Sequence, residues 1–258
     1  MTIYKKKSIM LLSKKKDVLP LQEKQEAFVA NCKTVLRRRL SGNKLIAYKE
    51  RLSLTTIQKE VLIGTLLGDA SISCRLGKPV YSVKFEQKHT QIDYINHLYE
   101  VFEPFVGTSP QMRTIINDYH KTPGQSCWFR TYSHISLKYY YDIFYVVNDV
   151  NRRVKRVPKT IAKLLTPRAL AYWYMDDGTA AFDKRNIGSF VLNTQGFNHA
   201  DHKRLVLALK IKFGIKATIF KDKTYFRLRI ASESKAIFLS LIREHIVPSF
   251  IYKLGRVL

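Results

Sequence analysis

Residues 62–70 read LIGTLLGDA and residues 170–178 read LAYWYMDDG, so one short pattern occurs twice in this chain of 258 residues. Each copy is an apolar run of helical character that ends in an acidic residue followed by Ala or Gly. Asp69 and Asp177 hold the same place in the pattern, eighth of nine, and lie 108 residues apart. The repetition predicts two related halves that meet at these helices.

The paired aspartates indicate a cation. A carboxylate at a helix C-terminus is unfavourable because the helix dipole is negative there. Bringing two such ends together adds like-charge repulsion, which a cation between the acids would relieve. Oxygen ligands suit a hard divalent ion, so Mg²⁺ or Mn²⁺ is the predicted cofactor. The alternative is that both are ordinary helix-end aspartates that face solvent.

The composition favours a polyanionic partner. Lys and Arg number 45 against 20 acids, which gives a formal net charge of +25. Such an excess is typical of proteins that bind nucleic acid or an anionic membrane surface. No apolar run approaches the roughly 20 residues of a membrane span, which favours nucleic acid over a membrane. The three cysteines form no CxxC pair, which indicates structural thiols and no zinc site.

The hydrophobic periodicity predicts an α+β fold. A capping box of Thr55 and Gln58 starts the first motif helix, and the Thr166-Pro167 pair starts the second. In the first half we predict strands at 71–75, 80–86, 111–116 and 126–132, and helices at 91–103 and 135–147. In the second half we predict a strand at 187–194, a hairpin around 221–223, and helices at 199–213 and 234–246. The first half therefore reads αββαββα, and the second repeats this order.

Charge and patterning divide the chain into four segments. They are a basic extension (1–44), a first half (45–147), a basic linker (148–160) and a second half (161–258).

Two predicted strands alternate between buried and polar faces. In YSVKFE (81–86), Ser82 and Lys84 share the polar face, and in YFRLRI (225–230) the polar face holds Tyr225, Arg227 and Arg229. Such stripes suit a sheet lying in a DNA groove, although a solvated basic face explains them equally well. The candidate DNA-binding residues are Ser82, Lys84, Arg130, Tyr225, Arg227 and Arg229.

The paired motifs resemble those of single-chain LAGLIDADG homing endonucleases. The resemblance runs from about Leu45 to Leu254 and is strongest in LTPRALAYWYMDDG and VLNTQGF of the second half. Both acids are retained, but Tyr172 stands where the family has Gly, which predicts looser packing there. The resemblance implies two pseudo-twofold-related αββαββα halves, each with an antiparallel DNA-binding sheet.

The resemblance also implies roles for individual residues. Asp69 and Asp177 would hold the metal ions, assisted by the backbone carbonyls of Gly68 and Asp176. Lys155 and Lys253, each after the last helix of its half, would line the active centres. Glu86, Asn193 and Gln195 would orient solvent. The implied activity is metal-dependent double-strand cleavage of DNA at a long asymmetric site, by a monomer of organellar origin.

Two other functions stay open. One is an RNA maturase of the same fold that assists splicing of a group I intron, in which case intron RNA is a partner. The other is a non-catalytic DNA-binding protein, which would need neither the acids nor the metal.

Overall fold

Local side chains start both motif helices, α3 (Thr56–Leu67) and α7 (Pro167–Asp177). The Thr55 hydroxyl accepts a hydrogen bond from the Gln58 amide, and the Gln58 side chain accepts one from the Thr55 amide. These bonds complete the predicted capping box. Before α7, the Thr166 hydroxyl accepts a hydrogen bond from the Ala169 amide, and Pro167 holds the first helical position. Both predicted helix starts are confirmed.

Each motif helix is followed by two strands, a helix, two strands and a further helix. The computed structural model describes residues 40–74, 80–116, 123–182 and 188–255, so the turn predicted at 77–79 and residues 1–39 lie outside it. The first half contains, after α3, the elements β1 (Ser71–Cys74), β2 (Tyr81–Lys88), α4 (Ile92–Phe102), β3 (Gln111–Ile116), β4 (Pro123–Arg130) and α5 (Lys138–Phe144). The second contains, after α7, β7 (Gly178–Phe182), β8 (Gly188–Leu192), α8 (His199–Phe213), β9 (Ala217–Asp222), β10 (Tyr225–Ile230) and α9 (Lys235–Ile242).

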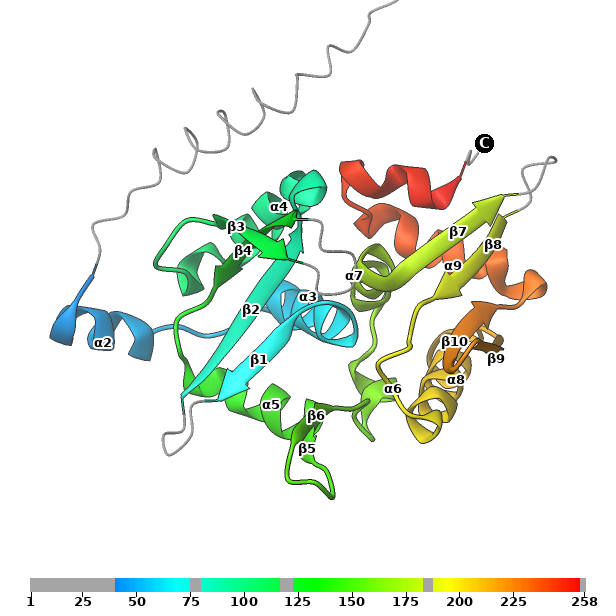
Figure 1. Cartoon of the computed structure of the whole chain (residues 1–258), viewed down its shortest axis with the longest axis horizontal. Coiled ribbons are helices and arrows are strands. Elements are labelled where there is room, and N and C mark those ends of the chain that lie inside the picture. The colour runs from blue at the N-terminus through cyan, green and yellow to red at the C-terminus, as the bar shows by residue number, and fades with distance from the viewer. Residues whose placement is uncertain (1–39, 75–79, 117–122, 183–187, 256–258) are drawn as a thin grey trace, which may run out of the picture. The chain divides into compact units, whose positions relative to one another are not determined.

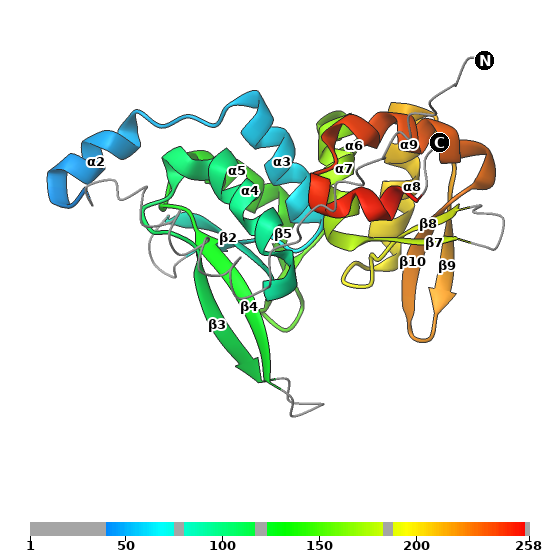
Figure 2. The same ribbon diagram turned by 90° about the horizontal axis from the view of Figure 1, so that it is seen from above.

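The two main sheets have the same topology. Their strand orders are β1-β2-β4-β3 and β7-β8-β10-β9, and neighbouring strands are antiparallel in both. Figure 1 shows α3 and α7 side by side between the two sheets. From the direction of Figure 2, the β3–β4 and β9–β10 hairpins extend the same way on either side of this helix pair. The predicted fold, two αββαββα halves that meet at the motif helices, is confirmed.

The contacts between α3 and α7 define a pseudo-twofold relation. Arg168 donates to the Glu60 carboxylate at 2.5 Å, and these two residues are equivalent in the repeat, 108 positions apart. One turn on, Gly64 lies against its equivalent Tyr172, and another turn on, Gly68 lies against its equivalent Asp176. A surface that meets its own equivalent is the mark of a twofold interface. The axis therefore runs along the seam between the helices.

Tyr172 does not loosen this interface, contrary to the sequence prediction. A Cβ atom on Gly64 would lie 2.8 Å from the Cβ of Tyr172 and 2.3 Å from the carbonyl oxygen of Ala169. Tyr172 itself is buried, and its ring stacks on His97 of α4, so the large side chain packs beside the α3–α7 contact and does not separate the two helices. The glycine of one helix therefore allows close contact although its equivalent is large.

Gly64→Ala is expected to destabilise the protein by about 1–3 kcal/mol. Alanine favours a helix over glycine by about 1 kcal/mol. The new methyl group would nevertheless collide with the backbone of Ala169, and a packed backbone cannot yield as a side chain can. Urea unfolding measures the change, and Gly196→Ala is the matched control because a Cβ there meets nothing within 4 Å. Equal stability of the two variants would contradict the close helix contact.

The structure corrects the prediction between residues 135 and 160. The helix predicted over 135–147 ends at Phe144, and Tyr145–Val147 instead forms β5, which pairs with β6 (Arg153–Lys155). Asn151 supplies the positive φ of the turn between them. The segment predicted as a linker therefore carries a strand, followed by the short helix α6 (Ile161–Leu164).

Two further points concern the edges of the prediction. The strand β7 was not predicted, and helix α2 (Gly42–Glu50) begins within the predicted basic extension. Across the described ranges, no helix combines the length and apolar character needed to span a membrane.

Candidate active site and nucleic-acid interface

The ends of α3 and α7 bring three carboxylates together. Asp69 directly follows the last turn of α3, and Asp176 and Asp177 close α7. The Asp69 amide donates to the Asp176 carboxylate at 3.1 Å. Burial, and then the charge of Asp69, raise the pKa of Asp177 to about 7, and the same two causes raise the pKa of Asp176 well above its usual value. The predicted repulsion between the two helix ends is therefore present.

Two lysines hold the backbone at these helix ends. Lys155, the last residue of β6, donates to the carbonyl oxygens of Gly68 at 2.9 Å and Ala70 at 2.8 Å. Lys253, in the 3₁₀ helix Pro248–Leu254, donates to the carbonyl of Met175 at 2.6 Å. Burial lowers the pKa of both ammonium groups, against the opposing charges of the aspartates. Cations at helix C-termini are stabilised by the dipole, so each lysine occupies a favourable position at the end of a motif helix.

The polar residues predicted to orient solvent occupy different environments. Asn193 lies next to the second centre, because its backbone amide donates to the Asp177 backbone carbonyl at 2.9 Å. Gln195 is half-buried in the turn after β8. Glu86 lines the same cavity as Asp69, and its carboxylate accepts hydrogen bonds from Ser126 at 2.6 Å and Arg113 at 2.5 Å and pairs with Lys84.

The neighbouring residue Gln87 contacts Asp69 directly, and it was not among the predicted site residues. Its side-chain amide donates to the Asp69 carboxylate at 2.8 Å and approaches the Asp176 carboxylate at 3.4 Å. Alternation along β2 explains the difference, because adjacent side chains of a strand point to opposite faces. A signal for Gln87 was available in the sequence: Gln87 follows Asp69 by 18 residues, and Gln195 follows Asp177 by the same interval.

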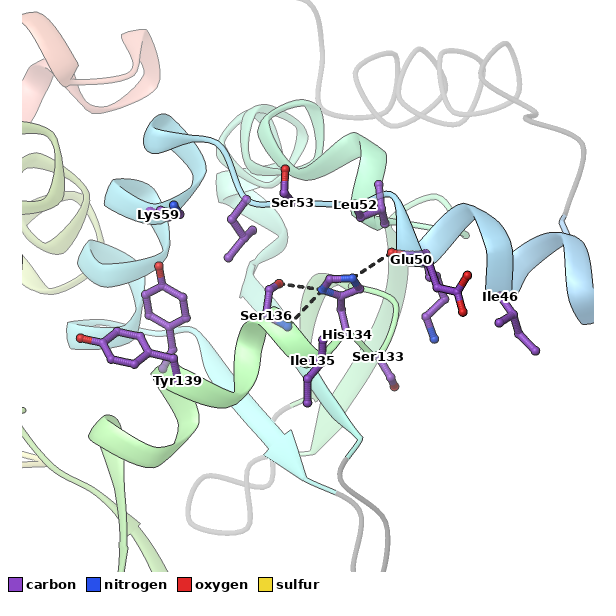
Figure 3. Close-up of a pocket in the computed structure, with 13 residues that line it drawn as sticks. Ile46, Glu50, Leu52, Ser53, Lys59, Ser133, His134, Ile135, Ser136 and Tyr139 are labelled. Carbon is purple, nitrogen blue, oxygen red and sulfur yellow. Dashed lines mark hydrogen bonds between the residues drawn. The ribbon is translucent and has the colours of Figure 1, made fainter.

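A cavity of about 610 Å³ opens at the first centre. Its lining joins Asp69 and Gln87 of the first half to Asp176 and Lys253 of the second. A larger cavity of about 900 Å³ lies elsewhere, between α2, the start of α3 and the start of α5. Figure 3 shows it lined by side chains such as Ile46 and Tyr139, with none of the predicted site residues among them. Of these two cavities, the smaller is the one lined by predicted site residues, among them Asp69, Asp176 and Lys253.

The donor set fits a hydrated divalent cation better than a closed metal cage. In the described ranges, no group of three or more His, Cys, Asp or Glu side chains is placed to hold a metal. Each centre instead offers one aspartate and the carbonyl oxygens of a helix end. Mg²⁺ commonly uses one or two carboxylates and takes its other ligands from water and a substrate phosphate. A bound cation would relieve the repulsion between the carboxylates, which favours its binding.

The polar face of the first sheet carries the predicted DNA-binding residues. Lys84 is half-buried and pairs with Glu86, and Arg130 donates to the hydroxyls of Ser73 at 2.6 Å and Ser82 at 3.3 Å. Ser82 is buried beneath Arg130. The face is therefore an ordered polar network in which Arg130 and Lys84 supply the positive charge.

The second sheet shows the predicted alternation along β10. Leu228 and Ile230 are buried, whereas Tyr225 and Arg229 are exposed. The Arg229 guanidinium lies over the Phe220 ring at 4.5 Å, and Arg227 pairs with Asp222 at 2.6 Å. Arg229 is therefore the freer of the two arginines to meet a partner.

Comparisons with known proteins agree with the overall fold. A model of the LAGLIDADG DNA endonuclease family matches residues 59–238. The chain is 28% identical over 212 residues to the DNA endonuclease I-ChuI of Chlamydomonas applanata, covering 79% of this chain and 97% of that protein. It is 29% identical over 212 residues to the cytochrome b mRNA maturase bI2 of Saccharomyces cerevisiae, covering 77% of this chain and 47% of the maturase. The solved structure of the homing endonuclease I-WcaI bound to its DNA recognition sequence matches with a TM-score of 0.73 and 28% identity, over 87% of this chain and 97% of that one.

Proposed function

The chain belongs to the LAGLIDADG DNA endonuclease family, and on that premise we propose that it is a site-specific, intron-encoded homing endonuclease that cleaves both strands of DNA with a divalent metal. The observation that carries the proposal is the pairing of Asp69 and Asp177 at the ends of two contacting helices, with a half-buried lysine at each end. A DNA-binding protein without catalysis would have no use for acids that repel one another next to the phosphate backbone.

Each centre would combine a metal with groups of this chain. Asp69 and Asp177 would each hold a divalent cation, Mg²⁺ or Mn²⁺, assisted by the carbonyl oxygens of Gly68 and Asp176. When bound, such a cation lowers the pKa of water and neutralises charge that builds on the phosphate. Two such centres at adjacent helix ends would suit a cut of both strands of one duplex.

The other residues would act on water and phosphate. Lys155 and Lys253 would neutralise the charge of the phosphate under attack, because their ammonium groups lie at the helix ends. Gln87 would orient the attacking water at the first centre, which is the role that the sequence prediction gives to Glu86. Asn193 and Gln195 would do so at the second. Glu86 would order Lys84 and Arg113 on the DNA-facing sheet.

The direct test is cleavage of a library of intron-insertion sites in Mg²⁺ buffer, scored for double-strand breaks. The proposal requires breaks at one long sequence and none with a chelator present. DNA binding without breaks, in Mg²⁺ buffer and again in Mn²⁺ buffer, would instead favour a non-catalytic DNA-binding protein.

Arg229→Ala is expected to relax sequence preference at one base pair. Arg229 projects from the polar face of β10, and an arginine that reads guanine with two hydrogen bonds contributes about 1–3 kcal/mol of discrimination. Binding to every single-base variant of the target measures the effect. Lys212→Ala is the matched control, because Lys212 is exposed on α8, which packs against β9 and β10. A loss that is uniform over all sequences would assign Arg229 to phosphate contact.

Intron RNA is a second candidate partner. The likeness to the yeast cytochrome b mRNA maturase supports it, and with it an organellar setting. Both activities can reside on one chain, so binding and splicing of the host intron transcript are measured separately from cleavage. Splicing that proceeds equally well without the protein would remove the maturase function.

A further inference from the structure

The two copies of the motif differ at the position nearest to the active centres. Gly68 of the first copy and Asp176 of the second are equivalent and lie in contact across the seam. A Cβ on Gly68 would come within 2.4 Å of the Cβ of Asp176 and 2.6 Å of its carboxylate. The glycine thus leaves the space that the aspartate side chain fills. Only one half can place a carboxylate there.

The Asp176 carboxylate reaches across the seam to the first centre. It accepts the backbone amide of Asp69 at 3.1 Å and lies 3.4 Å from the side-chain nitrogen of Gln87. The same nitrogen donates to the Asp69 carboxylate at 2.8 Å. Asp176 therefore holds both the backbone and the hydrogen-bond partner of an aspartate in the other half.

The second centre has no reciprocal support. The residue of the first half that is equivalent to Asp176 is Gly68, which has no side chain to offer the Asp177 backbone. Asp177 is instead held within its own half, where its backbone carbonyl accepts a hydrogen bond from the Asn193 backbone amide at 2.9 Å. The two centres are thus assembled differently although the folds around them match.

We infer that Asp176 is a positioning residue that the second half supplies to the Asp69 centre, so that the two strands of the target depend on it unequally. This inference rests on the proposed function. The competing explanation is that Asp176 merely fills the gap left by Gly68. A half-buried carboxylate that is repelled by Asp69 and Asp177 is an unfavourable way to fill a gap, because an alanine would fill part of the same space without charge. The Asp176 carboxylate accepts a hydrogen bond from the Asp69 backbone amide, which an apolar side chain in the same space could not do.

The test compares Asp176→Ala with Asp176→Asn. Alanine removes the acceptor for the Asp69 amide, whereas asparagine keeps a carbonyl oxygen in the same place. With a duplex labelled separately on each strand, Asp176→Ala is expected to slow cleavage of one strand by about 10–100-fold, the scale of a small misplacement of a catalytic group. The other strand should keep its rate within about threefold, and in Asp176→Asn the slowed strand should recover most of its rate, so that the bias largely disappears. DNA affinity in a chelator should be the same for all variants.

A second readout needs neither metal nor DNA. Amide hydrogen exchange at Asp69 in the metal-free protein should be faster in Asp176→Ala and close to wild type in Asp176→Asn. Glu60→Ala is the matched control, because it breaks the Glu60–Arg168 pair at the far end of the same helix interface. It should loosen the interface without strand bias and without faster exchange at Asp69.

The outcomes separate this inference from the proposed function. Equal slowing of both strands by Asp176→Ala, or the same bias in Glu60→Ala, would overturn the positioning role while leaving the nuclease intact. If the wild-type protein cuts no target, the proposed function fails. In that case unchanged exchange at Asp69 in Asp176→Ala would overturn the positioning contact as well.

Discussion

Asp69→Asn and Asp177→Asn are each expected to reduce double-strand cleavage by at least about 10²–10³-fold while DNA binding persists. Asparagine keeps the size of the side chain but lacks the negative charge that would hold a divalent cation at the scissile phosphate. Losing one preorganised electrostatic group of a transition state has costs of this order. Single-turnover cleavage at saturating protein measures the rate, and fluorescence anisotropy in a chelator measures binding. Losing a whole charge at one helix end should also disturb the adjacent centre, unlike the small displacement expected in Asp176→Ala, so each variant should retain at most weak nicking of one strand.

Asp142→Asn is the matched control for these two variants. Asp142 is an exposed carboxylate that pairs with Lys138 on α5, outside both centres. It should cleave like the wild type. Full activity in Asp69→Asn or Asp177→Asn would show that the acid is structural. Loss of DNA binding together with cleavage would show that the acids maintain the helix interface, and the catalytic roles would then have to pass to other residues.

The same substitution at Asp177 should stabilise the metal-free protein at high pH. The pKa of Asp177 is about 7 in the folded protein against an ordinary value of 3.8, so between these values the folded state binds more protons than the unfolded state. Stability from this group is therefore lost as pH rises from about 4 to 7. At about 1.4 kcal/mol per pKa unit, the cost at pH 8 approaches about 4 kcal/mol, which asparagine would remove. Urea unfolding in a chelator at pH 5 and pH 8 should show the gain mainly at pH 8.

The repeat carried most of what the sequence could predict. Cap residues such as Thr55 and Thr166 act on the next turn of the chain, so the starts of α3 and α7 were readable locally. The lysines at 155 and 253 were assigned from the family resemblance, and each lies at a helix end. Local signals that occur twice reinforce one another, and this is why the fold was predictable.

The incorrect predictions arise where strand pairing or packing, rather than a local pattern, decides the structure. Tyr145–Val147 continues an apolar helical pattern, and only its pairing with Arg153–Lys155 makes it a strand. Glu86 and Gln87 differ by one position in β2, and of the two only the interval from Asp69 to Gln87 matches that from Asp177 to Gln195, a signal that the prediction did not use. The reach of Asp176 to Asp69 spans 107 residues and requires the glycine opposite. No periodicity reports such a contact.

DNA affinity is expected to fall steeply with salt. The formal charge is +25, and residues 1–39 hold 11 Lys and Arg against three acids, so most of the excess lies in residues 40–258. Two basic sheets on a duplex would make six or more phosphate contacts. Each contact releases counterions, so the plot of log affinity against log salt should have a slope of about −5 or steeper. Between 50 and 200 mM salt the affinity should fall by about 10³-fold.

The slope also tests which residues carry the contacts. Binding of a long target duplex is measured at five salt concentrations in a chelator, so that cleavage does not interfere. Lys84→Ala removes a cation from the polar face of the first sheet and should make the slope shallower by about 1 if Lys84 reaches a phosphate. Lys163→Ala, on the exposed side of α6, should leave the slope unchanged. A wild-type slope near −1 would mean that the sheets do not lie on the phosphate backbone, and the two-sheet binding mode would have to be abandoned whatever the cleavage assays show.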